Sequence, residues 1–466
     1  MFRKKMIAMV VASAFGSGMA LPLTSYAADE DLAKKIEALS QELAALKKQV
    51  MANEDKAAKA VVTVGESRAA GGTARSGITL VESKALGSVE VYGRLYPEYT
   101  VASIKGATAK AAASAATMGA APTGSIDPPG RNSIDATNSR LGFKGKRDIG
   151  DGWAGVWQVE AKVSVDDGSN GTLGTRDSFV GLKSPFGTVT LGNITTVYKD
   201  NREPIRALAG AESGNTVSAS NLLASTPWSA TSTFHQRKAN SIRFNSEPLL
   251  GGLVLQAQYS PDEARVGNLN AYLTSFGFKY VNGPLWATLS YENHNDMFGG
   301  SGSKLPAAIA NATTGAGDIH SQDTAVRGVV AYTYGAERVS LTLSQIKYAE
   351  SGTRVAGKFD SFKSSPMEIA WAHQWAPKWR SVAAYVSADA GSCALTGGKV
   401  CNTAGLDGKM IILGASYNLI KDTELFAFYT NIKNGAAAMF NNTPNKLTVD
   451  PGASVTNISL GMTYDF

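Results

Sequence analysis

The chain has 466 residues, of which 44% are hydrophobic, with 48 glycines, two cysteines and a formal net charge of +6. Two cysteines exclude a disulfide-rich scaffold. Three of the positive charges lie in an expected signal sequence, so the mature charge is +3 and does not indicate nucleic-acid binding. Beyond that signal, no run of about 18 uncharged apolar residues predicts a membrane-spanning helix.

Residues 1–27 are predicted to be a secretory signal peptide. Basic residues at positions 3–5 precede the largely apolar stretch 6–23, and Ser25-Tyr26-Ala27 supplies small residues at the cleavage positions. The alternative is a membrane anchor, but glycine, proline and polar residues from position 16 onward interrupt the apolar run early.

Residues 28–50 are predicted to form a periplasmic coiled-coil helix. Apolar residues recur at alternating spacings of four and three, which is the heptad pattern that favours parallel self-association. The alternative is one short amphipathic helix lying on another surface. The seam residues are Leu32, Ile36, Leu39, Leu43, Leu46 and Val50.

Residues 51–86 are rich in alanine, glycine, serine and threonine, and we expect a mostly flexible linker there. From residue 87 to 466 the sequence repeats one unit: a strand, a short turn, a strand and a long loop. This asymmetry is typical of an outer-membrane barrel, whereas a soluble sandwich has loops of similar length at both ends.

The predicted fold class is all-β, a 16-stranded antiparallel transmembrane β-barrel preceded by a short α-helical coiled coil. The expected strands are about 88–103, 138–147, 153–165, 175–183, 186–194, 239–247, 252–261, 270–281, 284–293, 324–335, 337–348, 363–374, 379–388, 408–419, 423–432 and 453–466.

The last residues form an alternating strand that ends on an aromatic side chain. Ile458, Leu460, Met462, Tyr464 and Phe466 occupy one face, and small or polar residues occupy the other. A barrel needs such a strand, because its last strand must pair with its first. We expect the apolar face to contact lipid near the periplasmic rim.

Alternation also assigns the pore lining. A charge on the lipid face costs about 2–4 kcal/mol at mid-depth, so cations between apolar neighbours should point inward. We interpret them as an electropositive wall that attracts anions; the alternative is a solvated lumen without selectivity. The predicted pore-lining basic residues are Arg94, Arg140, Lys144, Lys146, Lys162 and Arg243.

The longest connection, residues 195–238, is the candidate constriction loop. Its acids Asp200, Glu203 and Glu212 would face the basic wall across the pore and create a transverse field. The alternative is an outer surface loop whose charges are solvated.

Cys393 and Cys401 are eight residues apart and are a disulfide candidate in an exported loop; the alternative is two unpaired thiols. The four histidines are scattered and form no metal-spaced cluster, and no nucleophile motif stands out. We therefore expect no enzyme, no metal and no cofactor.

Three motifs resemble the Gram-negative general porins of the neisserial and β-proteobacterial type. Residues 139–145 (SRLGFKG), followed by 148–153 (DIGDGW), resemble the second-strand signature of that family. Residues 176–182 and 186–192 resemble its next hairpin, and residues 239–244 resemble the strand after its constriction loop.

The resemblance implies a trimeric, water-filled diffusion porin with the third long loop folded inward. It implies basic wall residues at Arg140 and Lys144 and acids on the loop. It also implies that Phe466, with Tyr464 beside it on the same face, belongs to an assembly signal read by the barrel-assembly machinery. The heptad segment departs from the family, and some phosphate-selective porins carry such a helix.

We therefore expect an outer-membrane porin for passive diffusion of small hydrophilic solutes and ions, leaning toward anions. Expected partners are further copies of the chain in a homotrimer, outer-membrane lipid and lipopolysaccharide, and the cell wall through the N-terminal helix, which would lie in the periplasm; no nucleic acid is expected. The alternatives are a channel specific for phosphate or an organic anion, and a structural barrel that tethers the outer membrane.

Overall fold

The computed structural model divides the chain into two units, 1–61 and 62–466. It describes residues 41, 64–67, 75–83, 87–108, 127, 129–136, 138–168, 172–202, 216–228, 234–262, 269–297, 320–352, 355–444, 447 and 449–466. The predicted signal peptide and the coiled-coil seam lie outside these residues.

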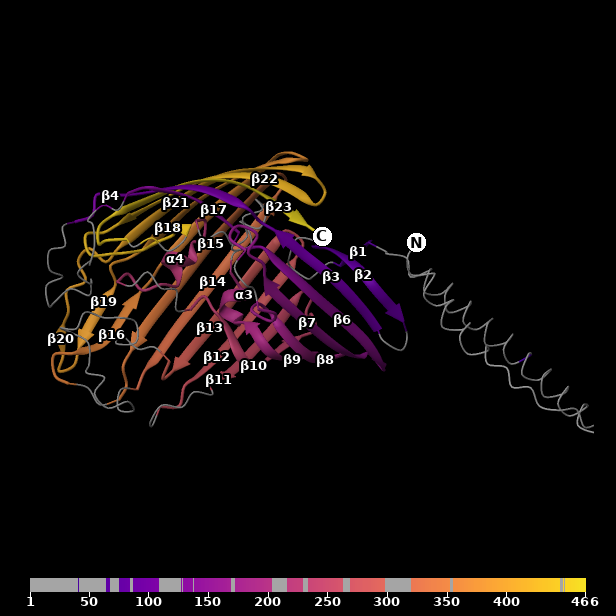
Figure 1. Cartoon of the computed structure of the whole chain (residues 1–466). Helices are drawn as coiled ribbons and strands as arrows, with labels where there is room; N and C mark the ends of the chain where they lie inside the picture. The colour runs from indigo at the N-terminus through magenta and orange to yellow at the C-terminus, as the bar shows by residue number, and fades with distance from the viewer. Residues whose placement is uncertain are drawn as a thin grey trace, which may run out of the picture. The chain divides into compact units, whose positions relative to one another are not determined.

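The second unit is almost entirely β-structure (Figure 1). Its strands are β1 (Val64–Ser67), β2 (Arg75–Ser83), β3 (Gly87–Leu95), β4 (Glu98–Lys105), β5 (Arg131–Asp135), β6 (Arg140–Gly150), β7 (Trp153–Lys162), β8 (Ser178–Ser184), β9 (Gly187–Thr195), β10 (Arg237–Ser246), β11 (Leu253–Pro261), β12 (Tyr272–Asn282), β13 (Leu285–Asn295), β14 (Gln322–Tyr334), β15 (Glu337–Ala349), β16 (Phe359–Ser364), β17 (Met367–Ala376), β18 (Trp379–Ala388), β19 (Ser392–Leu395), β20 (Lys399–Val400), β21 (Gly408–Ile420), β22 (Thr423–Asn434) and β23 (Ser454–Asp465). Two short helices, α3 (Val197–Asp200) and α4 (Ser220–Leu223), lie in the longest connection. None of the described helices is long and apolar enough to cross a membrane.

The strands close into an antiparallel barrel with sixteen wall positions. Four positions are each built from two collinear strands, namely β3 with β4, β5 with β6, β16 with β17, and β18 with β19. β3 and β4 are interrupted at Tyr96-Pro97. A proline is tolerated at this interruption, because the backbone N–H that proline lacks is not needed there for strand pairing. The barrel therefore has the strand number that the sequence predicts.

The wall is apolar outside and polar inside. On β15, Val339, Leu341 and Leu343 are 41–54% exposed, whereas the intervening Ser340 and Thr342 are at most 2% exposed. Because a strand alternates its side chains, one face can meet lipid and the other can face the lumen.

Tight turns join the strands at one end of the barrel. Gly283 and Pro284 lead from β12 into β13, and Gly283 has φ of 55°, which glycine adopts without a Cβ clash. The long connections lie at the other end, as the sequence predicts. We call these the short-turn end and the long-loop end.

The range that we expected to be a linker contains a hairpin. β1 pairs with β2, and β2 pairs with β3 from Gly77 opposite Tyr92 to Ser83 opposite Gly87. β3 extends past the end of β23, so its edge carries backbone groups that need partners. β2 pairs with that overhang, so two strands lie within the range 51–86 that we expected to be a mostly flexible linker.

The last strand closes the barrel against the first. β23 pairs with β22 on one side, and on the other with β4 and the end of β3. The closure ends at Gly93, whose N–H donates to the carbonyl of Phe466 (2.8 Å) and whose carbonyl accepts from the N–H of Phe466 (3.1 Å).

Side chains close the same seam on both faces. On the lumen face, the guanidinium of Arg94 binds the Asp465 carboxylate with two hydrogen bonds, Nε to Oδ1 at 2.5 Å and Nη2 to Oδ2 at 2.7 Å. On the outer face, the ring of Phe466 lies directly over Gly93, where a Cβ would collide with it. The ring of Tyr464 stacks beside that of Phe466.

The seam gives the first prediction. Gly93→Val should reduce the yield of closed barrel, because it displaces the Phe466 ring, and overpacking of this kind costs about 1–3 kcal/mol. The measurement is the folded fraction after refolding in detergent, read from the gel mobility of heated and unheated samples. Gly155→Val is the matched control, since a Cβ there has no neighbour nearer than 4.0 Å. Equal folded fractions for the two variants would contradict the role of this contact.

Candidate functional site: the loop-narrowed lumen

The strand register places three predicted cations in one row across neighbouring strands. Arg94 on β3 is opposite Arg140 on β6, and Arg140 is opposite Lys162 on β7. All three alternate with outward residues and therefore face the lumen. Like charges placed directly opposite each other destabilise a sheet, so this row costs stability.

The next rows toward the short-turn end combine cations with acids. Tyr92 donates its hydroxyl to Glu160 at 2.9 Å, and Arg176 forms an ion pair with the same carboxylate. One row further, Lys144 lies 3.0 Å from Glu90, with its side chain 29% exposed. Its ammonium also lies 5.4 Å from the centre of the Tyr92 ring.

Another predicted wall cation, Lys146, pairs with Asp148 at 2.8 Å near the short-turn end, where both side chains are largely exposed. At this position the two charges form a surface ion pair, which contributes little stability.

The first part of the long connection lies inside the barrel. In α3, the N–H of Tyr198 donates to Ser275 Oγ at 3.1 Å, and the hydroxyl of Thr288 donates to the carbonyl of Asn201 at 2.9 Å. Both wall residues are on lumen-facing positions of β12 and β13. The loop approaches β12 so closely at Gly277 that a Cβ there would meet Val197 at 2.8 Å and the Asn201 amide at 2.7 Å.

Arg327 on β14 holds the same segment. Its guanidinium carbon lies 4.0 Å from the centre of the Tyr198 ring, and its Nη1 donates to the Tyr198 carbonyl at 3.4 Å. The side chain is 1% exposed and also donates to Ser344. A cation held against a ring away from water is a strong attachment point.

The second described part of the loop packs on the opposite side of the lumen. Thr216 donates its hydroxyl to Glu98 on β4 at 2.8 Å, and its carbonyl accepts from Asn442 at 2.6 Å. Leu222 and Leu223 of α4 are buried against lumen-facing apolar residues of β17, β18, β21 and β22. The described parts of the loop thus rest on two separate stretches of wall (Figure 1).

An aromatic cluster fixes the loop toward the long-loop end. The Trp228 ring meets Phe362 edge-on at 4.9 Å and lies 6.2 Å from Tyr348. Phe234 stacks on His294 at 4.7 Å and packs against Tyr348. These edge-on and offset contacts are the favourable geometries for aromatic rings.

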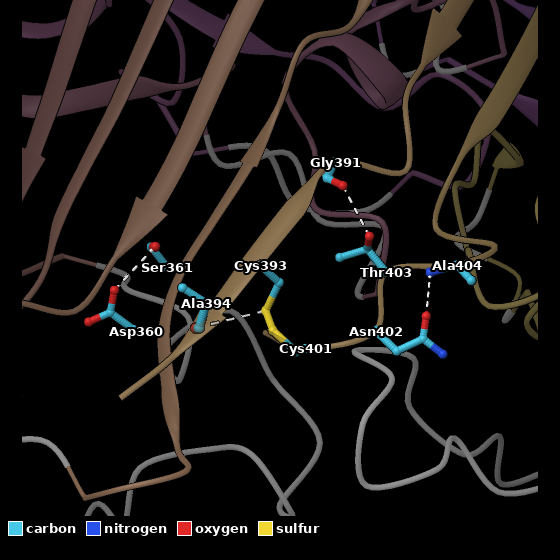
Figure 2. The surroundings of a disulfide bond; sticks show 9 residues. All are labelled: Asp360, Ser361, Gly391, Cys393, Ala394, Cys401, Asn402, Thr403 and Ala404. Atoms are coloured by element: carbon cyan, nitrogen blue, oxygen red, sulfur yellow. Dashed lines mark hydrogen bonds between the residues drawn. A yellow bond between two sulfur atoms is a disulfide. The ribbon is translucent and has the colours of Figure 1, made fainter. Parts of the chain in front are cut away.

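A disulfide joins Cys393 and Cys401 beside this cluster (Figure 2). The bond closes the β19–β20 hairpin, with Cα atoms 5.3 Å apart. Cys393 is opposite Phe362 in the β16–β19 pairing, so the hairpin supports the ring that Trp228 contacts.

The loop carries its own charges. Asp200 binds Arg243 of β10 at 2.6 Å, and Arg243 also donates to the carbonyl of Thr195 at 2.9 Å. Burial of the ammonium, with the guanidinium groups of Arg202 and Arg237 nearby, lowers the pKa of Lys199 to about 7. Arg237 is itself paired with Asp177 at 2.6 Å.

The carboxylate of Asp177 binds both ends of the long connection, at Thr195 and at Arg237. It accepts from the N–H of Thr195 at 2.7 Å as well as from Arg237. Burial raises the pKa of Asp177, but the Arg237 guanidinium and these hydrogen bonds outweigh it, so the pKa lies below its ordinary value. The carboxylate therefore stays ionised in the neutral range.

The structure adds detail to two sequence-based expectations about charge. Asp200 pairs with Arg243, a predicted wall cation on the strand that follows the loop, because both flank the point where the chain turns inward. Arg94 is bound to Asp465 in the seam, so part of its role is closure. Glu203 and Glu212 lie outside the described residues.

Sequence reasoning did not name Arg327 or Lys199. Arg327 stands between Val326 and Gly328 in an alternating strand, so the pattern that was applied to the first strands would have placed it in the lumen. Lys199 carries no such signal, because its position depends on how the loop packs. No group of three or more histidine, cysteine, aspartate or glutamate residues in the described part of the chain could hold a metal ion.

A closed antiparallel barrel with an apolar exterior, a charged interior and an inward loop defines a channel-type outer-membrane protein. The model of the Gram-negative porin family matches residues 59–437, and the chain belongs to that family. It is 30% identical over 169 residues to the major outer membrane protein P.IB of Neisseria meningitidis, which is 34% of this chain and 44% of that protein. The match therefore spans less than half of that relative's length.

Solved structures share the fold. The anion-selective porin from Comamonas acidovorans superposes with a TM-score of 0.58 at 20% identity, covering 82% of this chain and all of that one. The trimer form of OmpT from Vibrio cholerae has a TM-score of 0.55 at 16% identity, covering 82% of this chain and all of that one.

The contact at Gly277 gives the second prediction. Gly277→Val should push α3 off the wall and increase single-channel conductance or its fluctuation, because the loop loses its close approach to β12. The measurement is conductance in planar bilayers. Gly328→Val is the matched control, since a Cβ there has no neighbour nearer than 3.8 Å. If both variants conduct like the parent, the contact does not hold the constriction.

Proposed function

We propose that the protein is a water-filled porin for passive diffusion of small hydrophilic solutes and ions across the outer membrane. The observation that carries this proposal is the loop anchored inside a barrel whose lumen face is polar. The barrel supplies a wet path through an apolar layer, and the loop sets its width.

The channel leans toward anions. The support is the row Arg94, Arg140 and Lys162, where three like charges are opposite one another at a cost that an anion in the lumen would offset. A charged lumen also raises the local concentration of ions of opposite sign. The similarity in fold to the anion-selective porin from Comamonas acidovorans supports this proposal.

The functional unit is a homotrimer, in line with the trimer form of the similar Vibrio cholerae porin. The chain reaches the membrane through the barrel-assembly machinery, which reads the strand ending in Tyr464 and Phe466. The exposed Tyr464 and its stacked neighbour present an aromatic pair on the outer face, which suits such recognition.

Reversal potential in a salt gradient tests the anion preference. Arg140→Ala with Lys144→Ala should lower the anion-to-cation permeability ratio, because a unit charge about 7 Å from a permeating ion in water contributes roughly 0.6 kcal/mol, a factor of about three. The effect should shrink as salt rises. Lys409→Ala with Lys433→Ala is the control. Both lysines are exposed on the outer face, so these substitutions remove the same amount of charge outside the lumen.

An unchanged ratio in the lumen variant, with normal conductance, would overturn the assignment of the wall. A correctly folded barrel that gives no conductance at all would overturn the proposal of a porin and favour a structural anchor. A small conductance blocked by one particular anion would replace diffusion with a substrate-specific channel.

The pKa of Lys199 gives a pH prediction. A lysine with a pKa of about 7 is charged below that pH and neutral above it, so anion preference should rise as pH falls from 9 to 5. Lys199→Met should flatten that rise between pH 6 and 8. The same reversal-potential measurement across pH checks it, with Lys409→Met as control. A parent profile that is flat through pH 7 would contradict the prediction.

A further inference from the structure

The Cys393–Cys401 disulfide belongs to the same apolar cluster as the inward loop, which is the connection between β9 and β10. Both half-cystines are at most 5% exposed, and Trp228 and Phe234 of the loop lie in that cluster with them. Among the described strands, β20 pairs only with β19, over two residue pairs. Because a two-stranded hairpin is marginal by itself in water, the covalent bond does much to hold this segment in place.

The first line of contact runs from the disulfide to Trp228. Cys393 is opposite Phe362 in the pairing of β19 with β16, and the Trp228 ring meets Phe362 edge-on at 4.9 Å. Gly391, which leads into β19, approaches the same phenyl ring so closely that a Cβ there would lie 2.7 Å from it. The Phe362 ring therefore contacts both the segment that carries the disulfide and the loop in the lumen.

A second line of contact begins after Cys401. Thr403 donates its hydroxyl to the carbonyl of Gly391 at 3.0 Å, which ties the chain after the disulfide to the chain before it (Figure 2). The N–H of Leu406 then donates to the Thr403 carbonyl at 3.1 Å, and the Leu406 side chain is fully buried in the same apolar cluster. The segment 401–406 is thus folded against the hairpin.

This segment reaches the loop through the connection between β22 and β23. The carbonyl of Gly405 accepts from the N–H of Ala437 at 2.9 Å. Two residues further along that connection, the N–H of Met439 donates to the carbonyl of Pro227 at 2.7 Å. The two lines of contact therefore start at the two half-cystines and end at adjacent residues of the loop, Pro227 and Trp228.

We propose that the Cys393–Cys401 disulfide positions the inward loop, and that the channel with two free thiols at these positions conducts with a less steady current. This inference rests on the proposed porin function, because it concerns the loop that sets the pore width. Formation of the bond converts two thiols into one S–S bond and passes two protons and two electrons to a disulfide oxidant of the exported compartment. A steady pore therefore depends on oxidation of the chain after its export.

Local opening is the physical reason for the effect. Without the covalent link, the short hairpin opens while the barrel strands stay paired, because parts of a protein with few contacts open at low free energy. Phe362 and Leu406 then lose packing that they share with the loop. The loop keeps its attachments to the wall at Tyr198 and Thr216, so the width of the pore fluctuates and the channel stays open.

Single-channel recording of Cys393→Ala with Cys401→Ala in planar bilayers tests the proposal. Alanine suits both positions because they lie among apolar side chains, where a serine hydroxyl would need a partner. We expect the variant to fold and its open-channel current noise to rise about twofold or more, because the open form of the hairpin becomes populated. Asn295→Ala is the matched control. It removes a hydrogen bond, 3.1 Å to the carbonyl of Asn270, between the bases of two other long connections, and should leave the noise unchanged.

Reduction of the folded parent gives the same comparison without a substitution. Excess dithiothreitol is oxidised to its cyclic disulfide as each protein sulfur takes up a proton, and a thiol reagent counts the free thiols. The reduced parent should match the alanine variant, and reoxidation should restore the quiet current. If the alanine variant does not fold, this measurement decides the question in its place.

Trp228→Leu separates positioning of the loop from stability of the hairpin. If the disulfide acts through Trp228, its loss should add less noise to the Trp228→Leu channel than to the parent. A bond that stabilised only its own hairpin would make the barrel less resistant to heat on gels and leave the noise unchanged in both backgrounds, and that result would overturn the proposal. Full additivity of the two changes would also contradict it. A folded parent that gives no current at all would overturn the porin function itself, and this inference with it.

Discussion

Closure of the sheet is the constraint on which the rest of the molecule depends. Hydrocarbon offers no partner for a backbone N–H or carbonyl, so a strand in a membrane must have a neighbour on each side. The paired hydrogen bonds between Gly93 and Phe466 complete the ring of strands. Glycine is required there for a physical reason: the terminal ring covers it, and the Arg94–Asp465 pair occupies the other face. β2 then continues the pairing where β23 ends.

The inward loop modifies the simple rule of polar inside and apolar outside. β22 carries apolar residues on both faces: Leu425 and Tyr429 are exposed toward lipid, whereas Phe426 and Phe428 are buried toward the lumen. The inward rings lie in the apolar surface on which α4 packs. Burial of this surface supplies the free energy that holds the loop in the pore, at about 25 cal/mol per Å² of apolar area. The pore is narrowed by the same hydrophobic effect that assembles the core of a soluble domain.

The sequence predicts the fold well because alternation and turn spacing are local signals. The outward aromatic terminus follows from period two, whereas the strand number and the two unlike ends follow from the spacing of short turns and long loops. The site is less predictable. Asp200 pairs with Arg243, and Lys199 lies among arginines, only because the loop folds back into the barrel, which no local pattern encodes. The β1–β2 hairpin was missed for a related reason, since its strands are ordered by an overhang of β3 and not by strong strand composition.

Ion pairing decides how far a count of lumen cations translates into selectivity. Lys144, Lys146 and Arg243 each have a carboxylate within 3.0 Å, so each contributes mainly a dipole whose field falls quickly with distance. In the row Arg94, Arg140 and Lys162, the register places three cations at one height of the lumen, and Asp465 offsets part of the charge of Arg94 at the edge of the row. Their fields add at one height of the lumen. At physiological salt the screening length is about 8 Å, so only charges at nearly the same depth act together on an ion. The register of three strands, more than the number of cations, therefore sets where an anion is favoured.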